Sequence, residues 1–187
     1  MTNEDITKTA RHLRRIHETA DPRALCRCLD IQVDSFPMGA GKSALKGLIV
    51  RNSRCATISV NSDQPERTQA IVLFHEIGHY VLKHHERKQV CAFQDYGVFD
   101  SASDLEDEAN RFVAEYLLEN EQTLEALKAA NNFFHAASCL HVPKEILDYK
   151  MRMLRYYQLL TKSCPIYTPR DCMGSIDCSG AESSDYA

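Results

Sequence analysis

The feature that most constrains this chain is His75-Glu76-Ile77-Gly78-His79, an H-E-x-x-H pattern inside a long apolar segment. In a helix, residues four positions apart lie about 40° apart around the axis and one turn apart along it. The imidazoles of His75 and His79 would therefore meet one tetrahedral metal ion. Glu76 would point about 100° away from His75, which is too far for a ligand but suits a base acting on a metal-bound water.

The helix predicted around this pattern supports the metal interpretation. Residues 69–82 read Q-A-I-V-L-F-H-E-I-G-H-Y-V-L, so apolar residues surround the axis, as in a helix buried on most sides. Ionisable groups inside such a helix are costly to desolvate unless each has a strong partner, and zinc would supply one. The alternative is a core helix with two hydrogen-bonded histidines and an incidental glutamate. Residue type, spacing and burial together favour the metal.

Composition and charge place the chain among ordinary globular proteins. It has 187 residues, which suits one domain, with 44% hydrophobic and 26% charged residues and a net charge of −4. This charge gives no general attraction to nucleic acid, so we expect no direct nucleic-acid binding. The polar opening leads into no apolar leader, and no run approaches the length of a membrane span. These features predict a cytoplasmic protein without membrane contact.

The cysteine pattern does not change this picture. Five of the eight cysteines, at 26, 28, 55, 91 and 139, lie in or beside apolar segments, where a reduced thiol acts as a small hydrophobe. Cys164, Cys172 and Cys178 lack C-x-x-C spacing and give only a weak case for a second zinc site.

The periodicities predict an α+β fold. A single domain would span residues 1–161, and 162–187 would form a disordered tail. The domain would contain an amphipathic helix over 7–20 and a short helix over 21–29, strands over 31–33, 45–50 and 56–60, the H-E-x-x-H helix over 64–86, a loose connection over 88–103, a second helix over 104–119 and C-terminal helices over 121–160. Asn61-Ser62-Asp63 offers a cap for the H-E-x-x-H helix. His84 and His85 are expected to decorate its C-terminal end.

The helix over 104–119 offers a third ligand. Its apolar face places Glu106 on the buried side, whereas Asp107, Glu108 and Glu115 are expected to face solvent. Glu106 is thus the favoured ligand. The alternative role for Glu106 is the reciprocal half of a capping box that begins at Ser103. Asn110, one turn on, would hydrogen-bond the far nitrogen of a ligand histidine and fix its orientation.

Several runs of the sequence carry a family resemblance. They are Leu45-Lys46-Gly47-Leu48, Ile58-Ser59-Val60-Asn61, the HEIGH helix, Glu106-Asp107-Glu108-Ala109-Asn110-Arg111-Phe112-Val113-Ala114 and Leu140-His141-Val142-Pro143-Lys144-Glu145. Together they resemble the ImmA/IrrE family of zinc metallo-endopeptidases over roughly residues 20–160. One departure is Glu119-Asn120, where many members have Met-Pro, and it concerns the rim of the site.

The resemblance implies a small zincin-like domain, in which a short N-terminal β-sheet packs on the H-E-x-x-H helix and an all-helical part follows. Carried over residue by residue, it implies Zn²⁺ on His75, His79 and Glu106, with Glu76 as catalytic base. Members of the family cleave helix-turn-helix repressors of phage genes, mobile elements or damage responses, often encoded beside the protease. The expected partner is therefore a helix-turn-helix repressor encoded nearby.

The expected chemistry is zinc-assisted peptide hydrolysis, in which a further donor stabilises the oxyanion. Tyr80 and Tyr96 are candidate donors, together with His84 and His85, and the sequence does not choose between them. Two other classes stay open, namely a non-cleaving zinc-fold module that docks a repressor and a general zinc peptidase. Substrate selectivity would come from the 88–103 connection and from the helix after Pro143, whose Lys144, Lys150, Arg152 and Arg155 form either a partner surface or a solvated face. The sequence makes no prediction of the oligomeric state.

Overall fold

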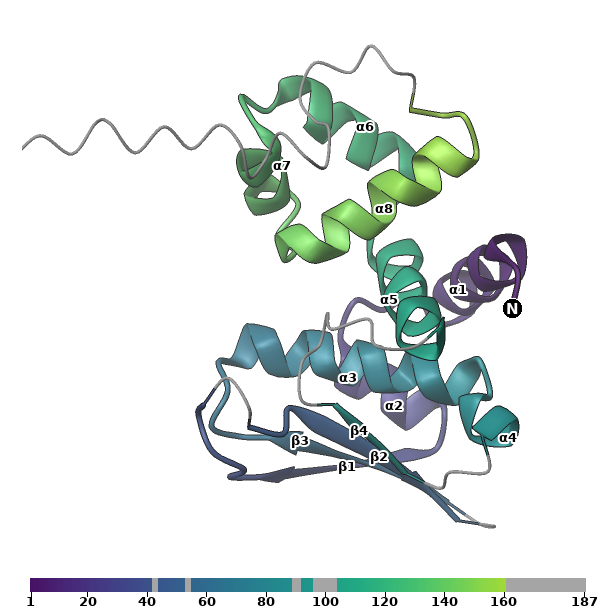
Figure 1. The fold of residues 1–187 in the computed structure, drawn as a ribbon, viewed down its shortest axis with the longest axis vertical. Coiled ribbons are helices and arrows are strands. Elements are labelled where there is room, and N and C mark those ends of the chain that lie inside the picture. Colours follow the sequence, from purple (N-terminus) through teal and green to yellow (C-terminus); the bar gives the residue numbers. More distant parts are fainter. Residues whose placement is uncertain (42–43, 53–54, 89–91, 96–103, 161–187) are drawn as a thin grey trace, which may run out of the picture.

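A computed structural model describes residues 1–41, 44–52, 55–88, 92–95 and 104–160, and its fold class is α+β, as predicted (Figure 1). The described elements follow in the order α1 (Asn3–His17), α2 (Pro22–Cys28), β1 (Ile31–Phe36), β2 (Gly47–Arg51), β3 (Ala56–Asn61), α3 (Glu66–Val81), α4 (His84–Lys88), β4 (Ala92–Asp95), α5 (Asp104–Leu117), α6 (Asn120–Ala129), α7 (Phe133–Cys139) and α8 (Lys144–Tyr156).

The elements are stacked in layers on a four-stranded sheet. The strand order is β1-β3-β2-β4, with β1 parallel to β3 and the other two pairs antiparallel. Helix α3 lies along one face of the sheet, and α5 packs on the opposite side of α3 beside α1 (Figure 1). Helices α6, α7 and α8 form the layer farthest from the sheet. A sheet packed on the H-E-x-x-H helix and followed by an all-helical part is therefore confirmed.

The contact between the sheet and α3 depends on a glycine. Ile49 and Ile58 point into the core from β2 and β3, where they are 5% and 0% exposed. A Cβ atom on Gly47 would lie 2.3 Å from Cγ1 of Val72 in α3, closer than non-bonded carbon atoms approach. Only glycine therefore lets β2 come this close to the helix that carries the two histidines.

Helix α3 is shorter than predicted at both ends. It begins at Glu66, its N-cap is Pro65, and no side chain caps it. The cap predicted at residues 61–63 is therefore wrong. The Asn61 amide instead donates to the carbonyl oxygens of Gly39 (2.8 Å) and Leu45 (2.7 Å), which fixes the loop before β2. At the other end α3 stops at Val81, because the chain turns at Lys83, where φ is +57°.

Two further predictions differ from the structure. Strand β4 lies inside the segment 88–103, which was predicted to be a loose connection, and it pairs with β2 from Gly47 to Val50. Helix α1 begins at Asn3 rather than Thr7, because Thr2 and Asp5 form a capping box. The predicted disordered tail, 162–187, lies outside the described residues.

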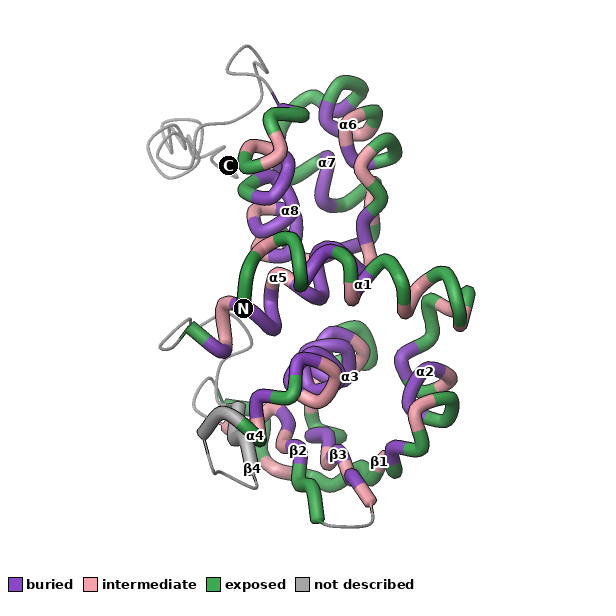
Figure 2. The backbone as a smooth tube through the Cα atoms, turned by 90° about the vertical axis from the view of Figure 1, so that its right-hand side faces the viewer, coloured by how far each residue is buried: buried purple, intermediate pink, exposed green. Residues whose placement is uncertain are grey.

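Burial follows these layers. Figure 2 shows most of α5 and the second half of α3 as buried, whereas α1 alternates between buried and exposed positions. Ile6 and Ala10 carry the buried side of α1, which packs on α5. Among the described cysteines Cys26 is buried, as predicted, whereas Cys28 and Cys139 are exposed. No helix in the described part of the chain has the length and apolar content that crossing a bilayer would require.

Candidate metal centre

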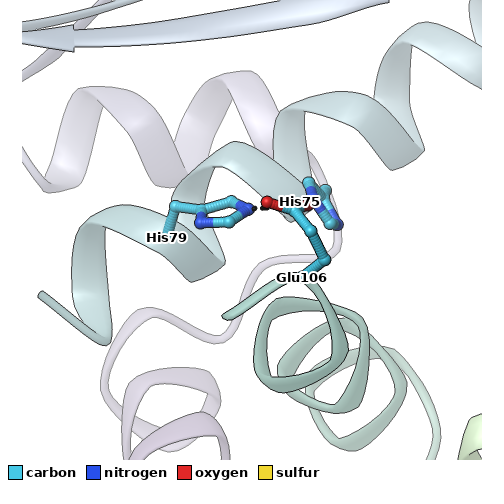
Figure 3. A group of neighbouring side chains, drawn as sticks. All are labelled: His75, His79 and Glu106. Carbon is cyan, nitrogen blue, oxygen red and sulfur yellow. Dashed lines mark hydrogen bonds and ion pairs between the residues drawn. The ribbon is translucent and has the colours of Figure 1, made fainter. Parts of the chain in front are cut away.

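Two helices bring three potential metal ligands together. His75 and His79 come from α3 and Glu106 from the first turn of α5, and their side chains point toward one another (Figure 3). The ligand atoms lie within 4.8 Å of one another. Oε2 of Glu106 is 2.9 Å from Nε2 of His75 and 3.2 Å from Nε2 of His79, and the two Nε2 atoms are 3.0 Å apart. Three potential metal-ligand atoms, two imidazole nitrogens and one carboxylate oxygen, thus converge on one point.

The close approach of α3 and α5 depends on a second glycine. A Cβ atom on Gly78 would lie 3.1 Å from Cδ1 of Phe112 and 3.3 Å from the carbonyl oxygen of Ala109, both in α5. These distances are already short for non-bonded contacts. Glycine at position 78 therefore lets α5 lie against α3. That approach brings Glu106 to the two histidines.

The donor set fits zinc. Two imidazole nitrogens and one carboxylate oxygen are ligands that zinc accepts, and three protein ligands leave a position open for a reacting molecule. Burial by itself would raise the pKa of Glu106, but hydrogen bonds and charge from His75 and His79 hold that pKa well below its usual range. The carboxylate is therefore ionised at neutral pH. A negative charge between two nearly buried imidazoles, 1% and 2% exposed, suits a cation.

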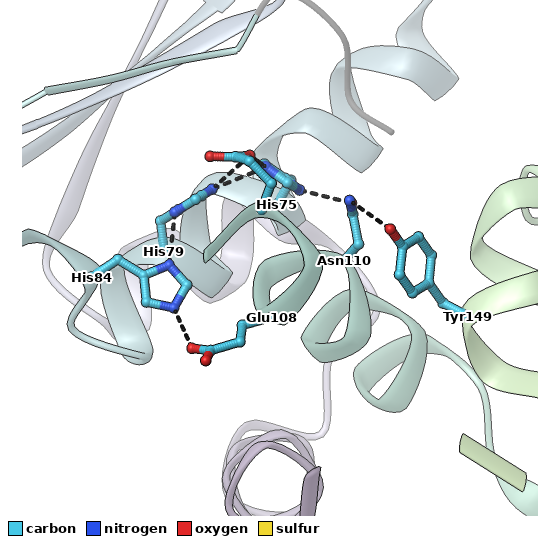
Figure 4. A network of polar contacts seen from close by, with 7 residues as sticks. His75, His79, His84, Glu108, Asn110 and Tyr149 are labelled. Carbon is cyan, nitrogen blue, oxygen red and sulfur yellow. Dashed lines mark hydrogen bonds and ion pairs between the residues drawn. The ribbon is translucent and has the colours of Figure 1, made fainter. Parts of the chain in front are cut away.

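The far nitrogen of His75 faces Asn110. Nδ1 of His75 lies 3.0 Å from Oδ1 of Asn110, and the Asn110 amide donates to the hydroxyl of Tyr149 at 3.5 Å (Figure 4). The structure therefore places Asn110 at the position that its predicted role requires. Tyr149 comes from α8, 39 residues further along the chain, so no local pattern in the sequence indicates it.

The far nitrogen of His79 faces residues that the sequence analysis placed elsewhere. Nδ1 of His79 lies 2.8 Å from Nδ1 of His84, and Nε2 of His84 lies 3.2 Å from Oε2 of Glu108 (Figure 4). His84 is 0% exposed and Glu108 is 6% exposed. His84 is therefore the buried first residue of α4 and not a surface residue at the C-terminal end of α3, and Glu108 does not face solvent. Both predictions were wrong.

Glu115 was also predicted to face solvent and is buried. It is 3% exposed and accepts a hydrogen bond from Lys150 of α8. The helical-wheel argument gave α5 a single buried side, but α1, α3 and α8 all pack against this helix. A helix covered on several sides buries acidic residues on more than one face.

Glu76 lies beside the ligand group and outside it. Its side chain is 0% exposed, and the position of a Cβ on Gly47 would be 3.3 Å from its Oε1. The Glu76 carboxylate is therefore on the side of α3 that faces β2. This agrees with the angular separation from His75 that the sequence predicts.

The candidates for oxyanion stabilisation are placed less favourably. The Tyr80 ring stacks on His85, with centroids 6.5 Å apart, and Arg51 lies 5.6 Å from the ring centroid. These contacts are made toward the end of β2, and Tyr80 is not part of the three-ligand group. Tyr96 and the predicted capping residue Ser103 lie outside the described residues.

Comparison with known proteins agrees with the geometry of this centre. The model of the Peptidase_M78 family, described as an IrrE N-terminal-like domain, matches residues 26–157. The match contains all three potential ligands, Glu76 and every strand of the sheet. A search of curated proteins found no match.

Proposed function

We propose that this chain, which belongs to the Peptidase_M78 family, is a zinc-dependent endopeptidase. Membership in this family supports a function of the metallopeptidase type. In our proposal His75, His79 and Glu106 hold the zinc ion and Glu76 is the catalytic base. The observation that carries the proposal is the convergence of two imidazole nitrogens and one carboxylate oxygen within 4.8 Å.

The four residues of the proposed site have separate roles in hydrolysis. A bound zinc ion would acidify a water molecule and polarise the carbonyl of the scissile bond. His75 and His79 present Nε2 to the metal position, and Glu106 presents Oε2. Glu76 accepts a proton from the attacking water and donates it to the leaving amine, so that one water is added across the peptide bond.

Substitution of single glutamates by glutamine tests the proposal. Wild-type protein should contain about one zinc per chain. It should hydrolyse an unstructured reporter peptide, whereas Glu76→Gln should keep the metal and lose hydrolysis. Glu66→Gln is the matched control, because Glu66 is an exposed glutamate of the same helix. Protein without zinc after reconstitution, or Glu76→Gln cutting at the wild-type rate, would contradict the proposal.

For the substrate we propose a helix-turn-helix repressor encoded nearby, cut at one or a few positions. The resemblance to ImmA/IrrE proteins supports this substrate class. The outer side of α8 supports a docking role through Lys144 and Arg152, whose side chains are 57% and 58% exposed. Lys150, which the sequence analysis grouped with them, is buried against Glu115 and belongs to the core.

The substrate proposal is tested with the repressor from the neighbouring gene. Zinc-loaded protein and repressor are incubated together, and the two are also co-expressed in cells under DNA damage. One discrete cleavage that disappears with Glu76→Gln is the expected result. An intact repressor together with efficient cutting of unrelated unfolded proteins would indicate a general peptidase. A stable complex without cleavage would indicate a docking module.

A further inference from the structure

We propose that His84 and Glu108 are positioning residues that orient the ligand His79 and fix its tautomer. The inference rests on the proposed zinc function, because it assigns Nε2 of His79 to the metal. The three side chains form a continuous line from the ligand group to the carboxylate of Glu108 (Figure 4).

The direction of each hydrogen bond follows from that assignment. A neutral imidazole that gives the lone pair of Nε2 to a metal carries its proton on Nδ1. The Nδ1–H of His79 then donates to Nδ1 of His84 across 2.8 Å. This leaves the proton of His84 on Nε2, which donates to Oε2 of Glu108 across 3.2 Å. Each of the two N–H groups therefore has one acceptor. The series of hydrogen bonds ends on the carboxylate of Glu108, which in its ionised form accepts hydrogen bonds and donates none.

The turn after α3 makes this arrangement available. On a continuous helix His84 would lie about 140° around the axis from His79 and would not reach it. The left-handed conformation of Lys83, with φ of +57°, ends α3 and starts α4 in a new direction. As a result His84 folds back onto His79, with the two ring centroids 4.8 Å apart.

The burial of His84 and Glu108 indicates a role beyond packing. His84 is 0% exposed, and apolar side chains would fill that position without the cost of desolvating two ring nitrogens. Glu108 reaches it from α5, the helix that also supplies Glu106, and its Oε1 contacts the N-terminal amine of Met1. The His84–Glu108 pair therefore ties the ring of one ligand to the helix that carries another ligand.

The two ligand histidines consequently have different support. His75 donates to the neutral amide oxygen of Asn110, whereas His79 is supported by a histidine that ends on a carboxylate. A carboxylate behind an imidazole raises the basicity of the ligand nitrogen, and loss of such a partner typically weakens metal binding about 10- to 100-fold. Replacement of His84 or Glu108 should therefore lower the zinc affinity of the protein.

The test measures zinc affinity, not activity alone. The zinc dissociation constant is measured by competition with a chromophoric chelator, for wild type, Glu108→Gln, His84→Leu and His84→Asn. Glu108→Gln keeps an acceptor and removes the charge, and His84→Leu removes the partner of His79. His84→Asn restores an acceptor near the position of Nδ1. Glu115→Gln is the matched control, because it alters a buried glutamate of the same helix that faces α8.

We expect the zinc affinity to fall about 10- to 100-fold in His84→Leu and Glu108→Gln, with partial recovery in His84→Asn. Glu115→Gln should stay within about threefold of wild type. The absorption spectrum of the cobalt-substituted protein should shift in the first two variants and not in the control. Urea unfolding of each metal-free variant identifies any that have lost the fold. His84→Asn serves as the folded replacement if His84→Leu does not fold.

Two results would overturn the inference. One is wild-type zinc affinity and an unchanged cobalt spectrum in folded His84→Leu and Glu108→Gln. The other is an equal loss of affinity in Glu115→Gln, which would reduce the effect to general destabilisation. Failure of the proposed function is distinguishable, because wild-type protein that binds zinc but cuts no peptide contradicts hydrolysis and leaves the affinity series intact. Wild-type protein that binds no zinc would overturn both.

Discussion

Replacement of Glu115 by leucine tests how the C-terminal helices are held on α5. The Glu115 carboxylate accepts a 2.7 Å hydrogen bond from the ammonium of Lys150, and both side chains are 1% exposed. A second cation, Arg11, lies 3.3 Å from Glu115, but its side chain is 52% exposed. Loss of the carboxylate leaves the Lys150 charge buried without this partner. Breaking a buried pair in this way costs about 3–5 kcal/mol of unfolding free energy.

The opposite replacement should cost less. Lys150→Met leaves the Glu115 carboxylate in contact with Arg11, so we expect a loss of about 1–3 kcal/mol. The double variant, Glu115→Leu with Lys150→Met, removes both charges from the interior and should lie within about 1 kcal/mol of wild type. The two single losses together should therefore exceed the double loss by at least about 3 kcal/mol, because the two residues are in direct contact and their effects do not add.

The cost of Glu115→Leu should also depend on pH, with a defined sign. Burial lowers the pKa of Lys150, and the charge of Glu115 opposes that shift. Without Glu115 the folded-state pKa falls further below the unfolded value of about 10.4. Between those two values the unfolded chain binds more protons than the folded chain, so the stability of the variant rises with pH. The destabilisation is therefore largest at low pH and shrinks as the pH approaches about 10.

The assay is urea unfolding of metal-free protein followed by far-UV circular dichroism, because the chain has no tryptophan. Measurements at about pH 7 and about pH 9.5 both lie below the unfolded pKa of Lys150, and the destabilisation should be smaller at about pH 9.5. A loss for Glu115→Leu below about 1 kcal/mol that is the same at both pH values would refute the argument. It would mean that water solvates the pair and that packing alone holds α8 on α5.

The other predictions concern the metal centre. Glu106→Gln should sharply weaken zinc binding in chelator competition, whereas Asp107→Asn, which alters a carboxylate paired with Arg111, should leave it nearly unchanged; equal losses would remove Glu106 from the ligand set. Gly78→Ala should push α5 away from α3, lowering the zinc affinity and costing about 1–3 kcal/mol in urea unfolding. Gly41→Ala is its control, because a Cβ on Gly41 would have no described atom within 4 Å. Removal of zinc by a chelator should lower the urea midpoint, and zinc at about 100 times its dissociation constant should restore about 2.7 kcal/mol; an unchanged midpoint would show that the fold binds no metal.

Sequence reasoning was strongest where a feature depends on local spacing. The placement of His75 beside His79 follows from four-residue spacing on one helix. For Glu106 the apolar face of the next helix indicated the correct side, although Glu108 and Glu115 are more deeply buried than Glu106. The α+β class was predictable for the same reason, because strand and helix periodicities are local, whereas the packing of the sheet on α3 was implied by the family resemblance. The structure brings these three side chains together from two separate helices.

The errors concern positions that local periodicity does not determine. His84 reaches His79 only because Lys83 adopts a left-handed conformation, which no periodicity indicates. Glu108 is buried because its partner His84 lies 24 residues earlier in the sequence, and Glu115 because Lys150 lies 35 residues later. The burial of Glu108 and Glu115 is thus decided by packing between distant segments, whereas the position of His84 depends on the backbone conformation of one residue.

Helix α5 therefore carries carboxylates, partly buried at Glu106 and buried at Glu115, whose charges are compensated by different partners. Glu106 faces α3, where two imidazoles and, in our proposal, zinc compensate its charge. Glu115 faces α8 and α1, where Lys150 and Arg11 do so. Nine residues of helix separate the two by about 13 Å, beyond the range at which substitutions usually couple. Loss of Glu115 should therefore reduce the folded fraction without weakening zinc binding by the molecules that remain folded, whereas loss of Glu106 should weaken zinc binding and leave the unfolding free energy of the metal-free protein nearly unchanged.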